Sequence, residues 1–198
     1  MTFEFSRFRL ELRFSFFAVC ALMLLCAEGT VALLCFGSSL LHECGHLLFL
    51  LLFSAGVRAL SFGAGGIVIE RSQTFCGTAR ECVIALGGVF VNLAVSLSAW
   101  LCYRRTGAQT AAVLCLVNGA LAALNLLPVR SLDCYRVLDL LLQQSGEDRR
   151  ERLLRRVSSA AVCAICACCL LLFALGIRNI SLAAVCVYLM LLHGKRSA

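Results

Sequence analysis

The residues best able to do chemistry lie in the run His42-Glu43-Cys44-Gly45-His46. Residues four apart on a helix lie one turn apart on the same face, so the two imidazoles can converge on one metal ion. Glu43 stands beside the first imidazole, where a carboxylate can act as a general base toward water. The spacing therefore predicts a zinc site with His42 and His46 as ligands and Glu43 as the catalytic residue.

This run lies within an apolar stretch, between Leu40-Leu41 and the segment Leu47–Phe53. An ionisable residue at the centre of a membrane costs about 2.5–3.5 kcal/mol on insertion scales, so a glutamate with two histidines needs pairing, water or a metal. Two other interpretations stay open at this point. One is a polar cluster that joins helices by hydrogen bonds, and the other is a proton or cation relay.

A hydrolytic zinc site usually has three protein ligands and one open position, so the two histidines need a partner. The remaining histidine is His193, in the last apolar stretch, and the acidic candidates near the ends of such stretches are Glu28, Glu70, Glu81, Asp133 and Asp139. Asp133 follows the chain's one proline, Pro128, and this break could aim its carboxylate back among the helices. A role as N-cap of the following helix fits Asp133 equally well.

The elements that must position these residues are apolar helices. The 198 residues are 61% hydrophobic and 15% charged, with a mean hydropathy of +0.93, far from the balance of a soluble domain. Stretches of the roughly 20 residues needed to cross a membrane occur at 9–27, 30–54, 79–103, 107–127, 153–176 and 179–193. We expect an all-α polytopic membrane protein with about six transmembrane helices, forming one domain over residues 1–198 with a catalytic core at about 30–142.

Two interruptions separate the apolar stretches. The glycine-rich segment Ser61–Gly66 and the β-branched run Ile67–Ile69 favour a short membrane-associated β hairpin or a re-entrant loop. Pro128 should end the helix before it, and a short helix is expected at Leu132–Leu142. The polar run Gln143–Arg156 is expected to be a solvated connection.

The charge distribution predicts the topology. The formal net charge is +7, but the basic residues are scattered without an aromatic-interleaved basic face, so no nucleic acid partner is expected. With a cytoplasmic N-terminus and a retained first helix, all but three of the 18 basic residues face the cytoplasm; the three are Arg104, Arg105 and Arg178. Both termini are therefore expected to be cytoplasmic. The 14 cysteines lie mostly in apolar stretches and are expected to be reduced.

Four residues, Asn125, Pro128, Leu132 and Asp133, follow the run at His42–His46 in an order that resembles the site-2 protease family of intramembrane zinc metalloproteases. The second motif of that family runs Asn-x-x-Pro, three further residues, then Leu-Asp-Gly, and the four residues match it position for position. The resemblance implies that Asp133 is the third ligand of one Zn²⁺ per chain. It also suggests that Asn125 hydrogen-bonds the substrate or the developing oxyanion, with capping of its own helix as an equal alternative.

Two further segments carry a weaker resemblance. Gly87–Asn92 resembles the family's Gly-Pro-x-x-Asn element, and Gly65-Gly66 resembles its substrate-binding strand, which adds Asn92, Gly65 and Gly66 to the candidate substrate or oxyanion contacts. For Asn92 two other roles stay open: an interhelical hydrogen bond, which is the commoner role, or a contact that supports a ligand.

The chain also departs from the family pattern at two positions. Cys134 stands where the family has glycine, and Val89 stands where it has proline. Cys134 adds a side chain beside Asp133, which could tighten the turn geometry or offer a thiol near the metal. Neither departure removes a ligand or the base.

The function that the resemblance implies is an intramembrane zinc metalloendopeptidase acting on membrane-tethered or transmembrane proteins in regulated intramembrane proteolysis. The compact span count is most like the bacterial sporulation-factor branch, whose members release a membrane-bound transcription factor precursor. The expected setting is the bacterial plasma membrane, with an active site open toward the cytoplasm. The expected partners are a membrane protein substrate and a membrane-bound regulator or inhibitor.

Two alternatives belong to other functional classes. One is a transporter or ion-binding protein in which His42, Glu43 and His46 form a proton or cation relay. The other is a non-catalytic chaperone of membrane helices, whose binding would survive both Glu43→Gln and the loss of zinc.

Overall fold

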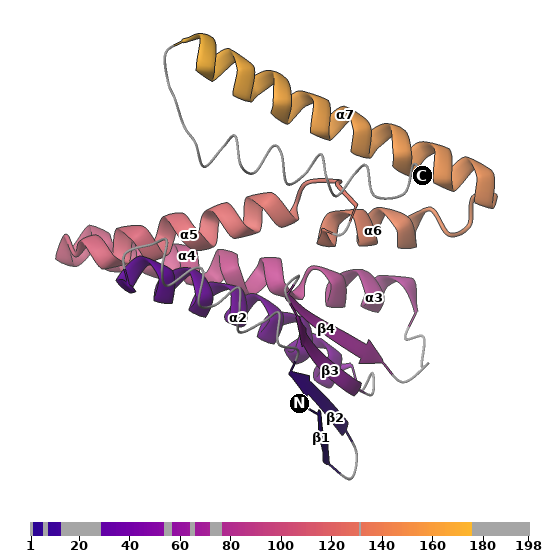
Figure 1. Ribbon diagram of the computed structural model, residues 1–198, viewed down its shortest axis with the longest axis horizontal. Coiled ribbons are helices and arrows are strands. Elements are labelled where there is room, and N and C mark those ends of the chain that lie inside the picture. Colours follow the sequence, from indigo (N-terminus) through magenta and orange to yellow (C-terminus); the bar gives the residue numbers. More distant parts are fainter. Residues whose placement is uncertain are drawn as a thin grey trace. The chain divides into compact units, whose positions relative to one another are not determined.

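The structure is a computed structural model that describes residues 2–5, 8–12, 29–53, 57–63, 66–71, 77–130 and 132–175. The chain forms two units, Met1–Ala123 and Leu124–Ala198. The described residues form six helices and four strands (Figure 1). Helices therefore dominate, as expected, and the sheet is larger than the short hairpin expected from the sequence. The single domain with its core at about 30–142 stays a prediction.

The helices are α2 (Gly29–Leu52), α3 (Thr78–Ala85), α4 (Gly87–Thr106), α5 (Gln109–Asn125), α6 (Asp133–Leu141) and α7 (Glu147–Ala174). The strands are β1 (Thr2–Phe5), β2 (Phe8–Leu12), β3 (Val57–Gly63) and β4 (Gly66–Arg71). The strands and α2 to α4 belong to the first unit, with all of α5 except its end, and α6 and α7 belong to the second.

Two described helices are long and apolar enough to cross a membrane by themselves, namely α2 and the part Glu147–Leu171 of α7. A third candidate is the pair α3 and α4, which are bent by 44° around Leu86. Helix α5 is apolar but shorter. These helices coincide with four of the expected spans, while the stretch 179–193 lies outside the described residues, so the number of six spans stays a prediction.

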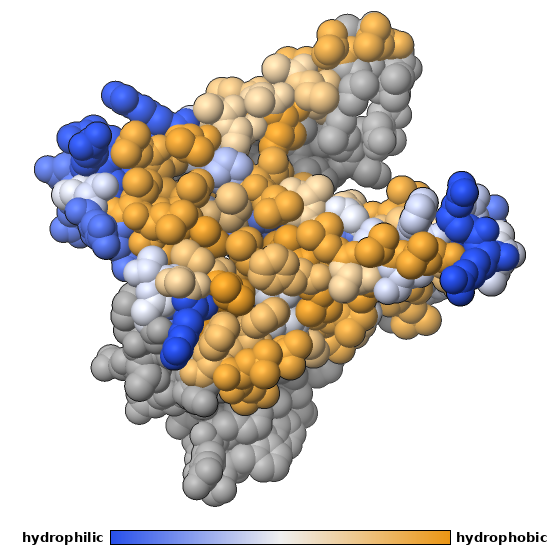
Figure 2. Space-filling model, turned by 180° about the vertical axis from the view of Figure 1, so that it is seen from behind, coloured by the Kyte–Doolittle hydropathy of each residue, from blue (hydrophilic) through white to orange (hydrophobic). Residues whose placement is uncertain are grey.

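The surface of α4 has the character of a helix in contact with lipid. Apart from Arg104 and Arg105 in its last turn, its exposed large side chains are apolar or aromatic: Phe90, Leu93, Leu97, Trp100, Leu101 and Tyr103. Figure 2 shows apolar residues over most of the helical surface, one group of hydrophilic residues where α4 meets α5, and another over the start of α7. There the guanidinium carbon of Arg104 lies 5.8 Å from the centroid of the Trp100 ring, a pairing typical of a membrane interface. The apolar helices therefore indicate a membrane protein.

The four strands form one sheet in the order β1-β2-β3-β4. Strands β3 and β4 are antiparallel, with Gly63 opposite Gly66, at the place where a hairpin or re-entrant loop was expected. Strand β2 runs parallel to β3, and Leu10 pairs with Leu60. Association of the β3-β4 pair with a membrane stays a prediction.

The prediction that the first membrane span, 9–27, begins at residue 9 is wrong. Residues Phe8–Leu12 form strand β2, because Phe8-Arg9-Leu10-Glu11-Leu12 alternates apolar and charged side chains with the two-residue period of a strand. Residues 13–27 of that span lie outside the described residues.

The helix break expected at Pro128 and the short helix expected after it are both present. Helix α5 ends at Asn125, shortly before Pro128, and α6 follows an extended Leu132 with φ −100° and ψ 160°. Leu132 is the N-cap and Asp133 is the first helical residue, so the N-cap role considered for Asp133 is wrong.

Helix α7 replaces most of the connection expected at Gln143–Arg156. It begins at Glu147 with acidic residues in its first turn, which favours the helix through its macrodipole. Asp139 of α6 accepts two hydrogen bonds from the Arg150 guanidinium, at 2.7 and 2.9 Å. This bidentate ion pair joins α6 to α7.

Helices α2 and α4 approach each other so closely that backbone meets backbone. A Cβ atom built on Gly45 would lie 2.5 Å from the carbonyl oxygen of Gly87 and 2.9 Å from the Cα of Gly88. Small residues permit such crossings between membrane helices. Next to the crossing, Leu50 and Ile84 are buried against Phe49 and Phe53. The histidine run is therefore held against the start of α4.

Replacing Gly45 with alanine is expected to force α2 away from α4, because the new methyl group would overlap the Gly87 carbonyl at 2.5 Å. We expect a loss of about 1–3 kcal/mol of stability, the usual cost of overpacking, measured as a lower Tm in detergent. The control is Gly37→Ala on the same helix, where no atom lies within 4 Å of the new methyl. Equal Tm values for the two variants would contradict the close crossing.

Candidate metal centre

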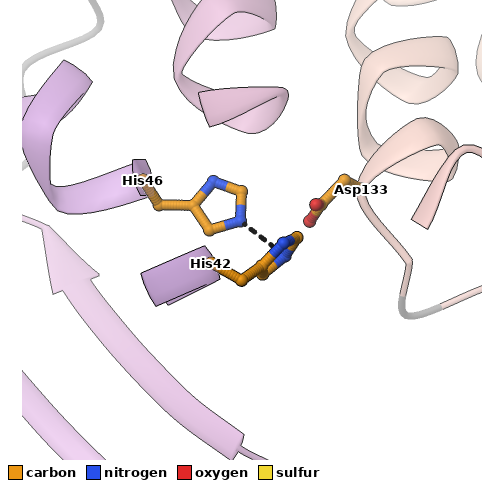
Figure 3. Close-up of side chains that lie close together, drawn as sticks. All are labelled: His42, His46 and Asp133. Atoms are coloured by element: carbon orange, nitrogen blue, oxygen red, sulfur yellow. Dashed lines mark hydrogen bonds between the residues drawn. The ribbon is translucent and has the colours of Figure 1, made fainter. Parts of the chain in front are cut away.

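His42 and His46 point their rings at a common position on one face of α2 (Figure 3). The ring centroids are 4.9 Å apart with planes at 84°, and the two Nε2 atoms are 3.3 Å apart. Two nitrogen ligands at 2.0–2.1 Å from one tetrahedral zinc ion are about 3.3–3.4 Å apart. The pair therefore has the separation that is needed to bind one ion through both Nε2 atoms.

The other nitrogen of His46 is occupied by a backbone acceptor. Its Nδ1–H donates to the carbonyl oxygen of Ile84 at 2.9 Å. Ile84 lies in the last turn of α3, before the bend at Leu86, and its carbonyl oxygen also accepts a backbone N–H at the end of that helix. Because Nδ1 carries the proton, Nε2 of neutral His46 presents a lone pair, as a metal ligand must.

His42 is held by two residues of α4. A Cβ atom at Gly88 would lie 2.5–2.7 Å from three atoms of the His42 ring, so the ring rests directly on this glycine. One turn later, Asn92 is fully buried and its Nδ2 lies 3.1 Å from His42 Nδ1. Asn92, expected from the sequence as a substrate or oxyanion contact, is placed by the structure on a candidate ligand.

The remaining candidate residues come from several elements. Glu43 is half-buried on α2, next in sequence to His42. Asn125 is the last residue of α5 and is also half-buried. Gly66 begins β4, opposite Gly63, whereas Gly65 lies outside the described residues. The structure leaves the expected roles of these residues as predictions.

Asp133, the third side chain drawn in Figure 3, belongs to the second unit and begins α6. It offers a carboxylate oxygen, where the two histidines offer ring nitrogens. The positive end of the helix dipole favours an ionised carboxylate at this position. Two imidazoles and one carboxylate are a donor set that suits zinc, so the candidate residues fit the implied metal by type.

Cys134 stands beside Asp133, at the position where the motif that this segment resembles has glycine. Burial, together with the negative charge of Asp133, raises the pKa of the Cys134 thiol. The substitution of glycine by cysteine therefore adds a neutral side chain, since a raised thiol pKa disfavours the thiolate at neutral pH.

Sequence reasoning missed two contacts of this centre, the carbonyl of Ile84 and the face of Gly88. The signal for Gly88 was available, because Gly88 and Asn92 are four residues apart and share a face of their helix. The Ile84 carbonyl had no comparable signal, because any residue could supply it.

Comparison with known proteins supports the fold. No family model and no curated protein matches the sequence. Among solved structures, the chain is similar to the Site-2 Protease from Methanocaldococcus jannaschii, with a TM-score of 0.62 and 17% sequence identity over 100% of this chain and 95% of that chain. At this identity the likeness shows a shared fold, and it gives no support to the sporulation-factor branch.

Gly88→Ala is expected to displace the His42 ring, because the methyl group would lie within 2.5–2.7 Å of three ring atoms. Zinc retained after purification should fall well below the wild-type level, measured by elemental analysis. Gly119→Ala is the control, since its methyl group would meet Ser96 Oγ at 3.3 Å, away from the histidines. Unchanged zinc in Gly88→Ala would mean that His42 does not bind the metal in this orientation.

Proposed function

We propose that this chain is an intramembrane zinc metalloendopeptidase that hydrolyses peptide bonds of membrane-tethered or transmembrane proteins. The observation that carries the proposal is the 3.3 Å separation of the His42 and His46 Nε2 atoms on a helix long and apolar enough to span a membrane. Glu43, between the two histidines in sequence, is the general base. The shared fold with a solved Site-2 Protease supports the same conclusion.

In this proposal Asp133 completes the ligand set for one Zn²⁺ per chain. Its support is the donor type, its place at the positive end of α6, and its match to the Leu-Asp motif that follows Asn125 and Pro128. Three protein ligands leave one position open, as in hydrolytic zinc sites. Bound zinc would polarise the scissile carbonyl and lower the pKa of water.

Glu43 performs the proton transfers. Its carboxylate takes a proton from the attacking water and passes it to the leaving nitrogen. The nitrogen therefore leaves as a neutral amine and not as an amide anion. Asn125 donates its side-chain N–H to the substrate carbonyl or the oxyanion that develops from it.

The substrate must be extended to expose its peptide bonds, because a helix hides them. Strand β4, which begins at Gly66, is an edge strand of the sheet. Its backbone could pair with a substrate segment by strand addition. We therefore include the segment around Gly65 and Gly66 in the proposed substrate-binding surface.

The proposed setting follows from the charge distribution. Both termini face the cytoplasm of a bacterial cell, the active site opens toward it, and a membrane protein substrate is joined by a membrane-bound regulator or inhibitor. Support comes from the basic residues, of which all but Arg104, Arg105 and Arg178 fall on one side of the expected topology.

A second candidate, a proton relay, is favoured by the hydrogen bonds that run from Asn92 through His42 and His46 to Ile84. Neither end of this series suits proton conduction, however. A backbone carbonyl and a side-chain amide do not pass protons on as an ionisable group does. The relay therefore ranks below the protease.

Glu43→Gln is expected to abolish cleavage while zinc is retained, because the amide cannot accept the proton of water. The rate on a tethered membrane substrate in liposomes should fall by about 10²–10⁴-fold. Glu147→Gln, at an exposed acid in the first turn of α7, is the matched control and should cleave like the wild type. Cleavage that survives Glu43→Gln, or zinc-dependent proton flux without cleavage, would favour the relay.

Asp133→Ala is expected to lower zinc content, because two imidazoles alone make an incomplete site. Elemental analysis of purified protein should show near-stoichiometric zinc in the wild type and clearly less in the variant. The exposed Asp148→Ala is the control for loss of an acid at a helix start. Equal zinc in both variants would remove Asp133 from the ligand set.

A further inference from the structure

We propose that Asn92 is a positioning residue that supports the metal-binding tautomer of His42 by turning its side-chain amide to accept the Nδ1–H. The inference rests on the proposed zinc site and concerns how the chain prepares that site. Three hydrogen bonds within the first unit support it. One lies within α2, one joins α2 to α3, and one joins α2 to α4.

These three hydrogen bonds have one consistent direction when both rings are neutral. The Ile84 carbonyl can only accept, so Nδ1 of His46 carries a proton and its Nε2 must accept. The contact between the two Nε2 atoms at 3.3 Å is then donated by Nε2–H of His42. That leaves Nδ1 of His42 as an acceptor, and the Asn92 amide N–H donates to it at 3.1 Å.

Metal binding requires the opposite tautomer of His42. An imidazole that gives Nε2 to zinc carries its proton on Nδ1, and that N–H needs an acceptor. The proton on Nε2 leaves to water and another is taken up at Nδ1, so the ring stays neutral. The Asn92 amide must then turn so that its oxygen, not its nitrogen, faces His42.

The structure leaves Asn92 able to make this turn. Its Oδ1 is buried and has no hydrogen-bond partner among the described residues, so exchanging the positions of Oδ1 and Nδ2 breaks no other bond of this side chain. The amide oxygen and nitrogen are nearly the same size, so the exchange leaves the packing around the fully buried side chain unchanged. Asparagine can thus donate before the metal arrives and accept afterwards.

The His42 ring has little freedom to find another acceptor. It rests on Gly88, where even a Cβ would overlap it at 2.5 Å. The position of Nδ1 is therefore fixed opposite Asn92. A residue without an acceptor there leaves the Nδ1–H of the metal-binding tautomer without the hydrogen bond that Asn92 would supply.

The chain provides a matched control in Asn118. It is also fully buried, but it lies on α5 and donates to Ser38 Oγ at 2.8 Å and to the Leu114 carbonyl at 2.9 Å. Removing the Asn118 amide tests the general cost of losing a buried amide between helices, without touching a histidine.

The test measures zinc affinity by chelator competition, and the histidine tautomers by ¹⁵N NMR, on the full chain in detergent. With only three histidines the spectrum is tractable. In the wild type, the proton of His42 is expected on Nε2 without metal and on Nδ1 with Zn²⁺. Asn92→Leu should bind zinc about 10–100-fold more weakly, as loss of such a partner typically does. Asn92→Ala repeats the test if the leucine variant does not fold.

Asn92→Asp supplies only acceptors, so it should place the proton on Nδ1 even without metal and restore affinity to at least the wild-type level. Asn118→Leu should leave zinc affinity unchanged. The proposal is overturned if Asn92→Leu binds zinc like the wild type, or if Asn92→Asp binds no better than Asn92→Leu. If this affinity pattern holds but no substrate is cut, the proteolytic function fails and the role of Asn92 stands.

Discussion

The close crossing of α2 and α4 at Gly45, Gly87 and Gly88 is the constraint on which the candidate metal centre depends. It brings the backbone of one helix against that of the other and leaves room for little except the His42 ring. Without it, Gly88 could not support His42 and Asn92 could not reach Nδ1. The glycine backbone atoms that determine the distance between α2 and α4 therefore also determine the position of the His42 ring.

The bend at Leu86 complements this crossing. At the break between α3 and α4 the Ile84 carbonyl oxygen accepts two hydrogen bonds, one from a backbone N–H at the end of α3 and one from the His46 ring. Polar groups inside apolar spans are costly unless each has a partner. Within the candidate centre, His46 has the Ile84 carbonyl as a hydrogen-bond partner, and His42 has the buried amide of Asn92.

Local patterns in the sequence predicted the parts of this arrangement that depend on one element alone. The i, i+4 spacing of His42 and His46 predicted a shared helical face, and Pro128 predicted the end of α5. Contacts between elements were less predictable. The hydrogen bond between His46 and the Ile84 carbonyl depends on a bend at which the sequence has no proline. The contact of Gly88 with His42 depends on which helices cross. Strand β2 was missed because its two-residue alternation joins an apolar stretch that suggested a helix.

The parallel pairing of β2 with β3 has a consequence for biosynthesis. Strand β2 ends at Leu12 and β3 begins at Val57, with α2, the helix that carries His42 and His46, between them in sequence. The ladder can therefore close only after the ribosome has made α2 and the strand that follows it, and closing so long a loop carries an entropic cost. Completion of the sheet thus comes late, because β2 cannot meet β3 before the histidine helix has been synthesised.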